Sequence, residues 1–299
     1  MSAPIRVLAR GEAAYPERLE AMAGPPARVW VRGEWPLPQR PVVALVGARA
    51  ASGAAMARTA DLAAELSRRG ALVISGGAIG IDAAAHLGAL RVGLPTIAVV
   101  APGLDDPYPA RNSRIFADIV AAGGALLSTV PPGTPVQKWH FPARNHVIAA
   151  LADAVVVTEC GALSGSTITA RAARALGRVV GATPGSTGTD ALVAAGAALV
   201  EHADDVLAAL AGRPRHPQVA GPDPGTAAAR VLDALDAIDA RGLDAVAART
   251  GLALRVCASA VSELELSGLA VAIPGARFLK SAACARPVAP ASTRVVERN

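Results

Sequence analysis

The sequence predicts a protein of the α/β class, with a doubly wound, mostly parallel sheet and a small C-terminal winged-helix domain. Three observations support this prediction. Short, continuous apolar segments alternate with Ala- and Leu-rich helical segments between residues 41 and 211. Turns rich in Gly and Ser follow several of these apolar segments. After a stretch rich in Pro and Gly, residues 226–280 contain three helical segments and a hairpin pattern.

The strands of the predicted sheet are short apolar runs, most of them followed by a helix. Their predicted positions are 42–47, 71–75, 96–101, 125–128, 152–159, 178–182 and 197–200. The helices between them are predicted at about 53–69, 81–92 and 112–122, and from a turn at 164–167 through Arg174. Strands without polar alternation are typical of a parallel sheet that is covered on both faces. The Pro-rich residues 1–40 are predicted to be an irregular lead-in segment.

The C-terminal region begins after a predicted linker at residues 212–225. Residues 226–280 form the predicted winged-helix domain, with a helix-turn-helix around Gly251 and a wing that closes at Pro274 and Gly275. Residues 281–299 are predicted to be a disordered tail. The winged-helix domain carries six basic and six acidic residues. This balance favours a protein-interaction or auxiliary role over tight binding of duplex DNA.

The composition limits the class of protein. Of the 299 residues, 52% are hydrophobic, which is enough to bury a sizeable core in more than one domain. The chain has no run of about 18 apolar residues and no signal-peptide pattern, so we predict a cytoplasmic protein without a membrane partner. Its three Cys residues are too widely spaced for a zinc site or a disulfide framework, and we predict no metal and no cofactor. The net charge of +5 leaves open a polyanionic partner or an Arg-rich compositional bias.

The most informative part of the sequence runs from Phe141 to Ala170. It contains Arg144 and Asn145, a buried strand, and a Ser-Gly-Ser-Thr turn at 164–167 that opens a helix. Such a turn at the carboxyl end of a parallel strand is a good anion site, because backbone N–H groups and the helix dipole favour negative charge there. The loops that follow the other strands should lie along the same edge of the sheet. We therefore expect a phosphate-binding edge.

Common catalytic classes are disfavoured by the motifs that the sequence lacks. It has no P-loop, no Gly-x-Ser-x-Gly nucleophile elbow and no metal-ligand spacing. Glu159 is the one carboxylate at the ligand edge that could act in catalysis, and an anchoring role is the favoured interpretation. His86 is expected to pack within a helix. Trp139 and Phe141 lie beside basic residues, as is typical of single-stranded nucleic acid binding, although core packing is an equal alternative for Phe141.

Six ordered motifs resemble those of the DNA-processing protein A family (DprA, also called Smf) of bacterial natural transformation. The motifs are VALVGARAASG, ISGGAIGIDAAAHLGAL, TIAVVAPGLDDPYPARN, FPARNHVIAAL, ECGALSGSTITA and TPGS. The resemblance covers roughly residues 12 to 280. It implies an extended Rossmann-like domain followed by a winged helix.

The resemblance also implies a protein that is not an enzyme. Members of the family bind single-stranded DNA, protect incoming strands, form homodimers and help to load the RecA recombinase. By this resemblance, the residues expected to contact nucleic acid are Arg49, Ser75, Gly76, Gly77, Arg144, Asn145, His146, Ser164, Gly165, Ser166 and Thr167. Lys138 is added to this set because it lies beside Trp139 and Phe141. Phosphates are expected on the Gly and Ser turns and on the two arginines of this set, so Arg144→Ala should lose most of the binding.

The chain departs from the family pattern at several positions. Leu163 and His146 stand where the family usually has basic residues, and Ser128-Thr129 stands where it commonly has Ser-Glu. His146 is a weaker cation than Arg at neutral pH. The loss of two cations is therefore expected to weaken the binding of DNA.

Two other functions compete with this one. The first is a nucleotide phosphoribohydrolase of the lonely-guy or lysine-decarboxylase-like type, which has a related fold. The segment LSGSTITAR at 163–171 lacks the glutamate that those enzymes carry after their Gly-rich loop, and this absence disfavours them. The second is a transcription regulator that uses the winged helix, which the neutral charge of that domain disfavours.

Overall fold

The protein was analysed as a computed structural model, which describes residues 3–35, 41–162, 164–216, 222–236, 239–273 and 275–281. The chain divides into two compact units. The first, an α/β unit, comprises Met1–Val193 and Ala197–Arg215, and the second comprises Ala194–Gly196 and His216–Asn299.

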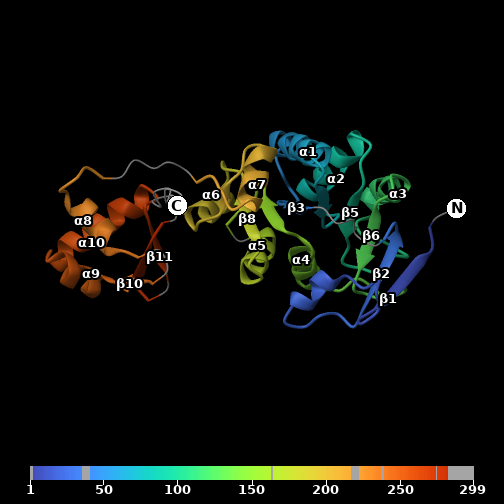
Figure 1. Ribbon diagram of the computed structural model, residues 1–299, viewed down its shortest axis with the longest axis horizontal. Coiled ribbons are helices and arrows are strands. Elements are labelled where there is room, and N and C mark those ends of the chain that lie inside the picture. Colours follow the sequence, from blue (N-terminus) through green and yellow to red (C-terminus); the bar gives the residue numbers. More distant parts are fainter. Residues whose placement is uncertain are drawn as a thin grey trace, which may run out of the picture. The chain divides into compact units, whose positions relative to one another are not determined.

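The described part of the α/β unit contains one sheet of nine strands (Figure 1). In chain order they are β1 (Ile5–Ala9), β2 (Arg28–Gly33), β3 (Val42–Val46), β4 (Leu72–Ser75), β5 (Thr96–Val99), β6 (Ala125–Ser128), β7 (Ala154–Val157), β8 (Val179–Ala182) and β9 (Ala198–Leu199). The spatial order is β1-β2-β6-β5-β4-β3-β7-β8-β9. Strands β3 to β9 run parallel, and the chain winds outward from β3 in both directions. The predicted doubly wound sheet is confirmed.

Residues 3–35 contain two strands, and the prediction that the N-terminal segment is irregular is wrong for these described residues. Strands β1 and β2 pair antiparallel, and β2 pairs antiparallel with β6 through Trp30 opposite Ser128. Between β1 and β2, the short 3-10 helix η1 (Glu17–Ala21) buries Leu19. The alternation in β2, where Val29 and Val31 are buried, is the pattern of a strand with one covered face.

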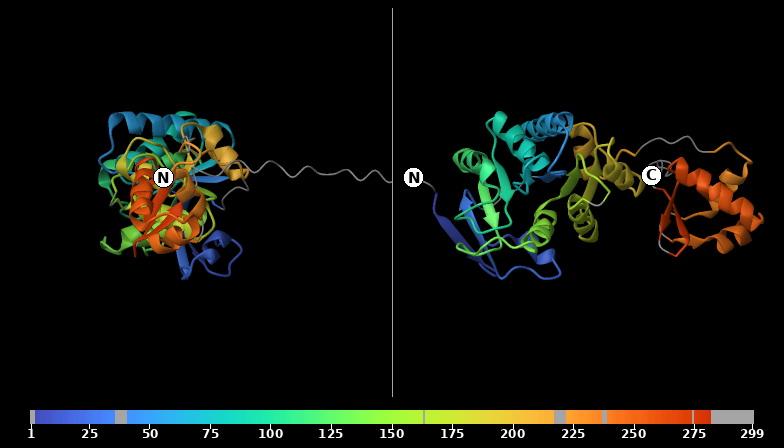
Figure 2. Two further views of the ribbon diagram at one scale, coloured as in Figure 1. Left: turned by 90° about the vertical axis from the view of Figure 1, so that its left-hand side faces the viewer. Right: turned by 180° about the vertical axis from the view of Figure 1, so that it is seen from behind.

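Helices cover both faces of the sheet. They are α1 (Gly53–Arg68), α2 (Ile81–Arg91), η2 (Ala110–Asn112), α3 (Ser113–Ala121), α4 (His140–Leu151), α5 (Ser166–Ala175), α6 (Thr187–Ala194) and α7 (Ala203–Leu210). Helices α1, α2 and α3 lie on one face, and α4 and α5 lie on the other (Figures 1 and 2). Strand β3 is buried on both faces: Val43 and Leu45 pack with α1, whereas Val42 and Ala44 pack with α4. This two-sided burial explains the continuous apolar strands.

Helix α4 was missing from the sequence prediction. Its residues from Val147 to Leu151 are all buried, so the helix has no amphipathic period in its second half. Asn145 lies in the middle of α4.

The C-terminal unit is a winged helix, as predicted. Its elements are α8 (Ala227–Ala234), β10 (Arg241–Gly242), α9 (Leu243–Thr250), α10 (Leu254–Leu266), β11 (Ala270–Ile273) and β12 (Arg277–Lys280). Gly251 ends α9 with a φ of +66°, a conformation that glycine adopts without strain, and so makes the turn into α10. Residues 217–221 of the predicted linker, Pro274 of the predicted wing and residues 282–299 of the predicted tail lie outside the described residues.

Among the described residues, no group of three or more His, Cys, Asp and Glu residues is placed to hold a metal ion. No single helix in this part of the chain has both the length and the apolar composition to cross a membrane, whereas α9 and α10 meet that criterion as a pair bent by 108°.

Candidate nucleic-acid interface

A cavity of about 270 Å³ opens at the carboxyl edge of the sheet, at the end of β3. This is the point from which the sheet winds in two directions, and such points are where open α/β sheets bind ligands. Six of the residues predicted to contact nucleic acid line the cavity: Arg49, Arg144, Asn145, Ser164, Gly165 and Ser166. A smaller cavity of about 60 Å³ has Arg49, Phe141 and Arg144 in its wall as well, and it is also lined by Gly76 and Tyr108.

The turn before α5 forms one wall of the larger cavity. The backbone N–H of Ser166 donates to Ser164 Oγ over 3.3 Å, and Thr167 Oγ1 donates to the Ser164 carbonyl over 2.7 Å. Asn145 Nδ2 donates to the Gly165 carbonyl over 3.2 Å, which ties the turn to α4. Gly165 is exposed, and a Cβ at this position would meet nothing closer than 4.0 Å. The turn is therefore fixed to α4 and open at Gly165, at the N-terminal end of α5 where the helix dipole favours negative charge.

Arg49 forms the exposed side of the cavity. It follows β3, and its guanidinium carbon lies 4.9 Å from the centroid of the Phe141 ring. Phe141 in turn meets Tyr108 edge to face, with 6.2 Å between ring centroids. The Arg49 side chain makes no ion pair with the described residues, so its charge is available to a ligand. A cation stacked on an aromatic ring offers a phosphate partner and a stacking surface together.

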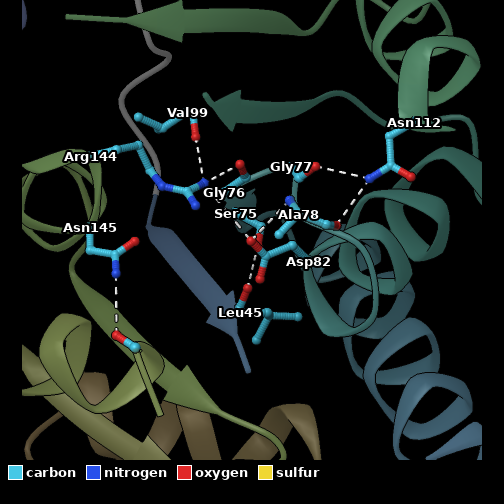
Figure 3. Close-up of polar contacts among 11 residues, drawn as sticks. Leu45, Ser75, Gly76, Gly77, Ala78, Asp82, Val99, Asn112, Arg144 and Asn145 are labelled. Atoms are coloured by element: carbon cyan, nitrogen blue, oxygen red, sulfur yellow. Dashed lines mark hydrogen bonds and ion pairs between the residues drawn. The ribbon is translucent and has the colours of Figure 1, made fainter. Parts of the chain in front are cut away.

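Arg144, in contrast to the exposed Arg49, is buried in the wall of the cavity (Figure 3). Its Nη1 donates to the Val99 carbonyl at the end of β5 over 2.9 Å and to the Gly76 carbonyl. The same nitrogen lies 3.9 Å from Asp82 Oδ2. Burial lowers the pKa of Arg144, and the carboxylate of Asp82 opposes that shift. Burial raises the pKa of Asp82, and the nearby Arg144 charge opposes part of that rise.

The turn at residues 76–78, which follows β4, is fastened by several side chains (Figure 3). Asp82 Oδ2 accepts from the Ala78 backbone N–H over 3.2 Å. Asn112, which is buried, donates from Nδ2 to the carbonyls of Gly77 and Ala78 over 2.9 Å and 3.0 Å. A Cβ on Gly76 would lie 1.8 Å from Arg144 Nη1, so this close approach requires glycine.

Comparison with known proteins identifies the family. The family model described as DNA recombination-mediator protein A matches residues 6–211, and the model described as DprA winged helix domain matches residues 215–276. The chain belongs to the DprA family. Among its relatives, Protein Smf of Escherichia coli is 34% identical over 284 residues, which cover 90% of this chain and 76% of the relative.

Two solved structures of DprA proteins share the fold. DNA processing protein A from Streptococcus pneumoniae superposes with a TM-score of 0.64 at 37% identity, over 68% of this chain and 74% of that one. The protein from Helicobacter pylori superposes with a TM-score of 0.62 at 27% identity, over 72% of this chain and 100% of that one. The latter structure was described as showing a unique single-stranded DNA binding mode of DNA processing protein A.

The remaining residues expected to contact nucleic acid lie away from the larger cavity. Ser75 is fully buried and donates from Oγ to the Leu45 carbonyl over 2.6 Å, so it braces β4 against β3. Gly77 is buried within the turn at residues 76–78. The Thr167 hydroxyl donates to the Ser164 carbonyl in its own turn. Lys138 and His146 are exposed and line neither of the two cavities. Leu163, where the family usually has a cation, lies outside the described residues.

Glu159 has the anchoring role that the sequence favoured. Its carboxylate accepts from the Ser52 backbone N–H over 2.8 Å and from Ser52 Oγ over 2.7 Å, at the start of α1. Asp82 is the acidic side chain that lines the larger cavity among the described residues, and the sequence argument did not select it. Its place in the motif GIDAAAH was the available signal. Asn112 had the same kind of signal, because it ends the motif TIAVVAPGLDDPYPARN, but its partners are 34 and 35 residues away in the chain.

Proposed function

We propose that this chain is a single-stranded DNA-binding recombination mediator. It protects incoming DNA and helps to load the RecA recombinase during natural transformation, acts in the cytoplasm as a homodimer, and catalyses no reaction. The observation that carries the proposal is the open cavity at the carboxyl edge, which has the Ser164–Ser166 turn on one side and Arg49 on the other. Arg49 makes no ion pair among the described residues.

The surroundings of the cavity favour a polymer over a small nucleotide. Tyr108 and Trp139 are 50% and 66% exposed, so aromatic faces outside the cavity are open to further bases. Lys138 and His146 are exposed on the same chain segment, where they can meet further phosphates. Membership of the DprA family and the single-stranded DNA binding of the Helicobacter pylori relative support the same ligand.

One observation bears on the alternative of a phosphoribohydrolase. Asp82 places a carboxyl group in the wall of the cavity, and burial raises its pKa. That carboxyl group already accepts from the Ala78 N–H and lies beside the Arg144 guanidinium. A group held in this way is suited to fixing the turn, and we therefore keep the non-enzymatic proposal.

The test is a titration of fluorescently labelled single-stranded and duplex oligonucleotides at two salt concentrations. We expect the single strand to bind more tightly, with an affinity that falls steeply as salt rises. Equal binding of duplex, or no binding of either, would overturn the proposal. Incubation with AMP tests the enzyme directly, because release of adenine would establish a phosphoribohydrolase. RecA filament formation on protein-coated single strands, with and without this chain, tests the loading step.

A further inference from the structure

Two arginines line the cavity, and their hydrogen bonds assign them different tasks. Arg144 directs its Nη1 to the backbone carbonyls of Gly76, after β4, and Val99, at the end of β5 (Figure 3). Its side chain is only 7% exposed, and that of Asp82 beside it is 9% exposed. Arg144 Nε is covered from solvent as well, and it has no hydrogen-bond partner among the described residues. Because its side chain is covered, Arg144 is less accessible to a phosphate in the open cavity than the exposed Arg49.

The groups around Arg144 all converge on the turn at residues 76–78. The three carbonyl oxygens of the turn accept from Arg144 and Asn112, and the Ala78 N–H donates to Asp82. The partial negative charges of these carbonyls are therefore directed into the protein and away from an anionic ligand. Side chains from α4, from η2 and from the first turn of α2 meet at this one turn.

The residues that follow the turn pack against the loop that carries Arg49. Gly80 has a φ of +80°, and a Cβ there would lie 2.4 Å from the Ala48 carbonyl oxygen and 2.5 Å from that of Arg49. The next residue, Ile81, donates its backbone N–H to the Ala48 carbonyl over 3.2 Å. The position of the Arg49 backbone thus depends on the turn that Arg144 fastens.

From these contacts we infer that Arg144, together with Asp82 and Asn112, is a positioning residue for nucleic acid binding. The three side chains hold the turn at residues 76–78 so that Arg49 meets the phosphate, and Arg144 is not itself the phosphate ligand. This inference deepens the proposed function and rests on it.

The test compares the salt dependence of single-stranded DNA binding in matched variants. Loss of a phosphate ligand lowers the slope of log affinity against log salt by about 0.7. Loss of a positioning residue lowers the fraction of molecules that are ready to bind, and so lowers the affinity equally at every salt concentration. We expect Arg49→Gln to lower the slope by about 0.7. We expect Arg144→Gln to lower the affinity about tenfold or more with the wild-type slope.

Two further variants guard against a simple folding defect. Asn112→Ala removes no charge and leaves Arg144 in place, and we expect about a threefold loss of affinity with the wild-type slope. Leu66→Ala opens the fully buried core beneath α1, outside the lining of both cavities, and should lower the melting temperature without changing the affinity. Hydrogen exchange measured without DNA should speed up at residues 76–81 in Arg144→Gln and Asn112→Ala, and not in Arg49→Gln.

Three results would overturn the inference. They are a slope that falls in Arg144→Gln as far as in Arg49→Gln, wild-type affinity in Asn112→Ala, and unchanged hydrogen exchange at residues 76–81 in both positioning variants. A wild-type protein that binds no single strand would instead remove the proposed function, while the exchange measurement would still report on the fastening of the turn.

Discussion

Arg49 and Arg144 face the same cavity and differ in almost every physical property that matters for binding. Arg49 is exposed, rests on the Phe141 ring and has no ion-pair partner among the described residues. Arg144 is buried, binds two backbone carbonyls and lies beside Asp82. The exposed arginine keeps its charge for a ligand, whereas the buried arginine uses its Nη1 to hold two backbone carbonyls. Charge near a site and charge available to a ligand are therefore separate quantities.

The largest expected difference between the two arginines is in stability. Arg144→Leu leaves Asp82 buried without its cation, and such a change costs about 3–5 kcal/mol. Arg49→Leu removes an exposed cation on a ring and should cost no more than about 1 kcal/mol. Urea denaturation at pH 7 measures both free energies of unfolding. Equal losses in the two variants would contradict the comparison.

The double variant Arg144→Leu with Asp82→Leu is the control for this prediction. Removal of both charges takes away the uncompensated carboxylate, so part of the lost stability should return. A double variant that is less stable than Arg144→Leu alone would show that the pair is not the cause.

The second expected difference between the two arginines is in how folding stability responds to acid, because the charge of Arg144 acts on His86. Burial, reinforced by the charge of Arg144, lowers the pKa of His86 to about 3. His86 Nδ1 lies 2.9 Å from Thr96 Oγ1, which itself donates to the Val73 carbonyl, so Nδ1 carries the proton. Its Nε2 is buried without a hydrogen-bond partner among the described residues.

The sign of the pH effect follows from this pKa. The unfolded chain takes up a proton on His86 below its ordinary pKa of about 6.5, and the folded protein does not until pH is near 3. Above about pH 6.5, His86 is neutral in both the folded and the unfolded protein and does not reduce stability. Below that pH the free energy of unfolding falls as pH falls toward 3, because only the unfolded chain binds the proton. Between pH 7 and pH 4, wild type should lose about 3 kcal/mol more than His86→Gln.

Urea denaturation across this pH range in wild type and His86→Gln makes the measurement. Arg49→Leu should keep the wild-type profile, and Arg144→Leu should make it shallower because a nearby positive charge is gone. A profile unaffected by His86→Gln would show that His86 does not remain neutral in the folded protein.

The smallest expected difference is between two glycines of the site, Gly76 beside the buried Arg144 and Gly165 in the turn before α5. Gly76→Ala places a Cβ 1.8 Å from Arg144 Nη1 and 2.5 Å from Asp82 Oδ2, so we expect a loss of about 1–3 kcal/mol. Gly165→Ala has open space and an ordinary φ of −58°, so its effect on stability should stay within about 0.5 kcal/mol. Thermal unfolding of the two variants makes the comparison, and a Gly165→Ala protein as destabilised as Gly76→Ala would reject it.

The sequence predicted the parts of this molecule that depend on local pattern. Strand β6 was predicted at 125–128 and is found there. A short, fully buried apolar run between a helix and a polar loop is too short to form a helix, so a strand is the expected structure. The Ser164–Ser166 turn was predicted to lie at the ligand edge and lines the cavity for a similarly local reason. Helix α4 was missed because its second half is buried on every side.

The positions of the arginines depend on contacts that are distant in the sequence. Arg144 binds carbonyls 45 and 68 residues away, and no local pattern indicates which way its side chain turns. Asn112 is fixed in the same way by a turn that lies 34 or 35 residues earlier. The cluster exists only once the sheet order has brought the ends of β4 and β5 beneath α4.

The N-terminal hairpin gives the sheet a protected border. Strand β2 pairs with β6 at four positions and satisfies backbone groups that would otherwise face outward beside a fully buried apolar strand. The outermost strand, β1, is five residues long and carries the exposed Arg6, while β9 at the other border has two residues. Short or charged border strands discourage pairing with other chains. A version of the protein that starts at residue 41 would expose β6, and we expect it to self-associate through that strand and precipitate.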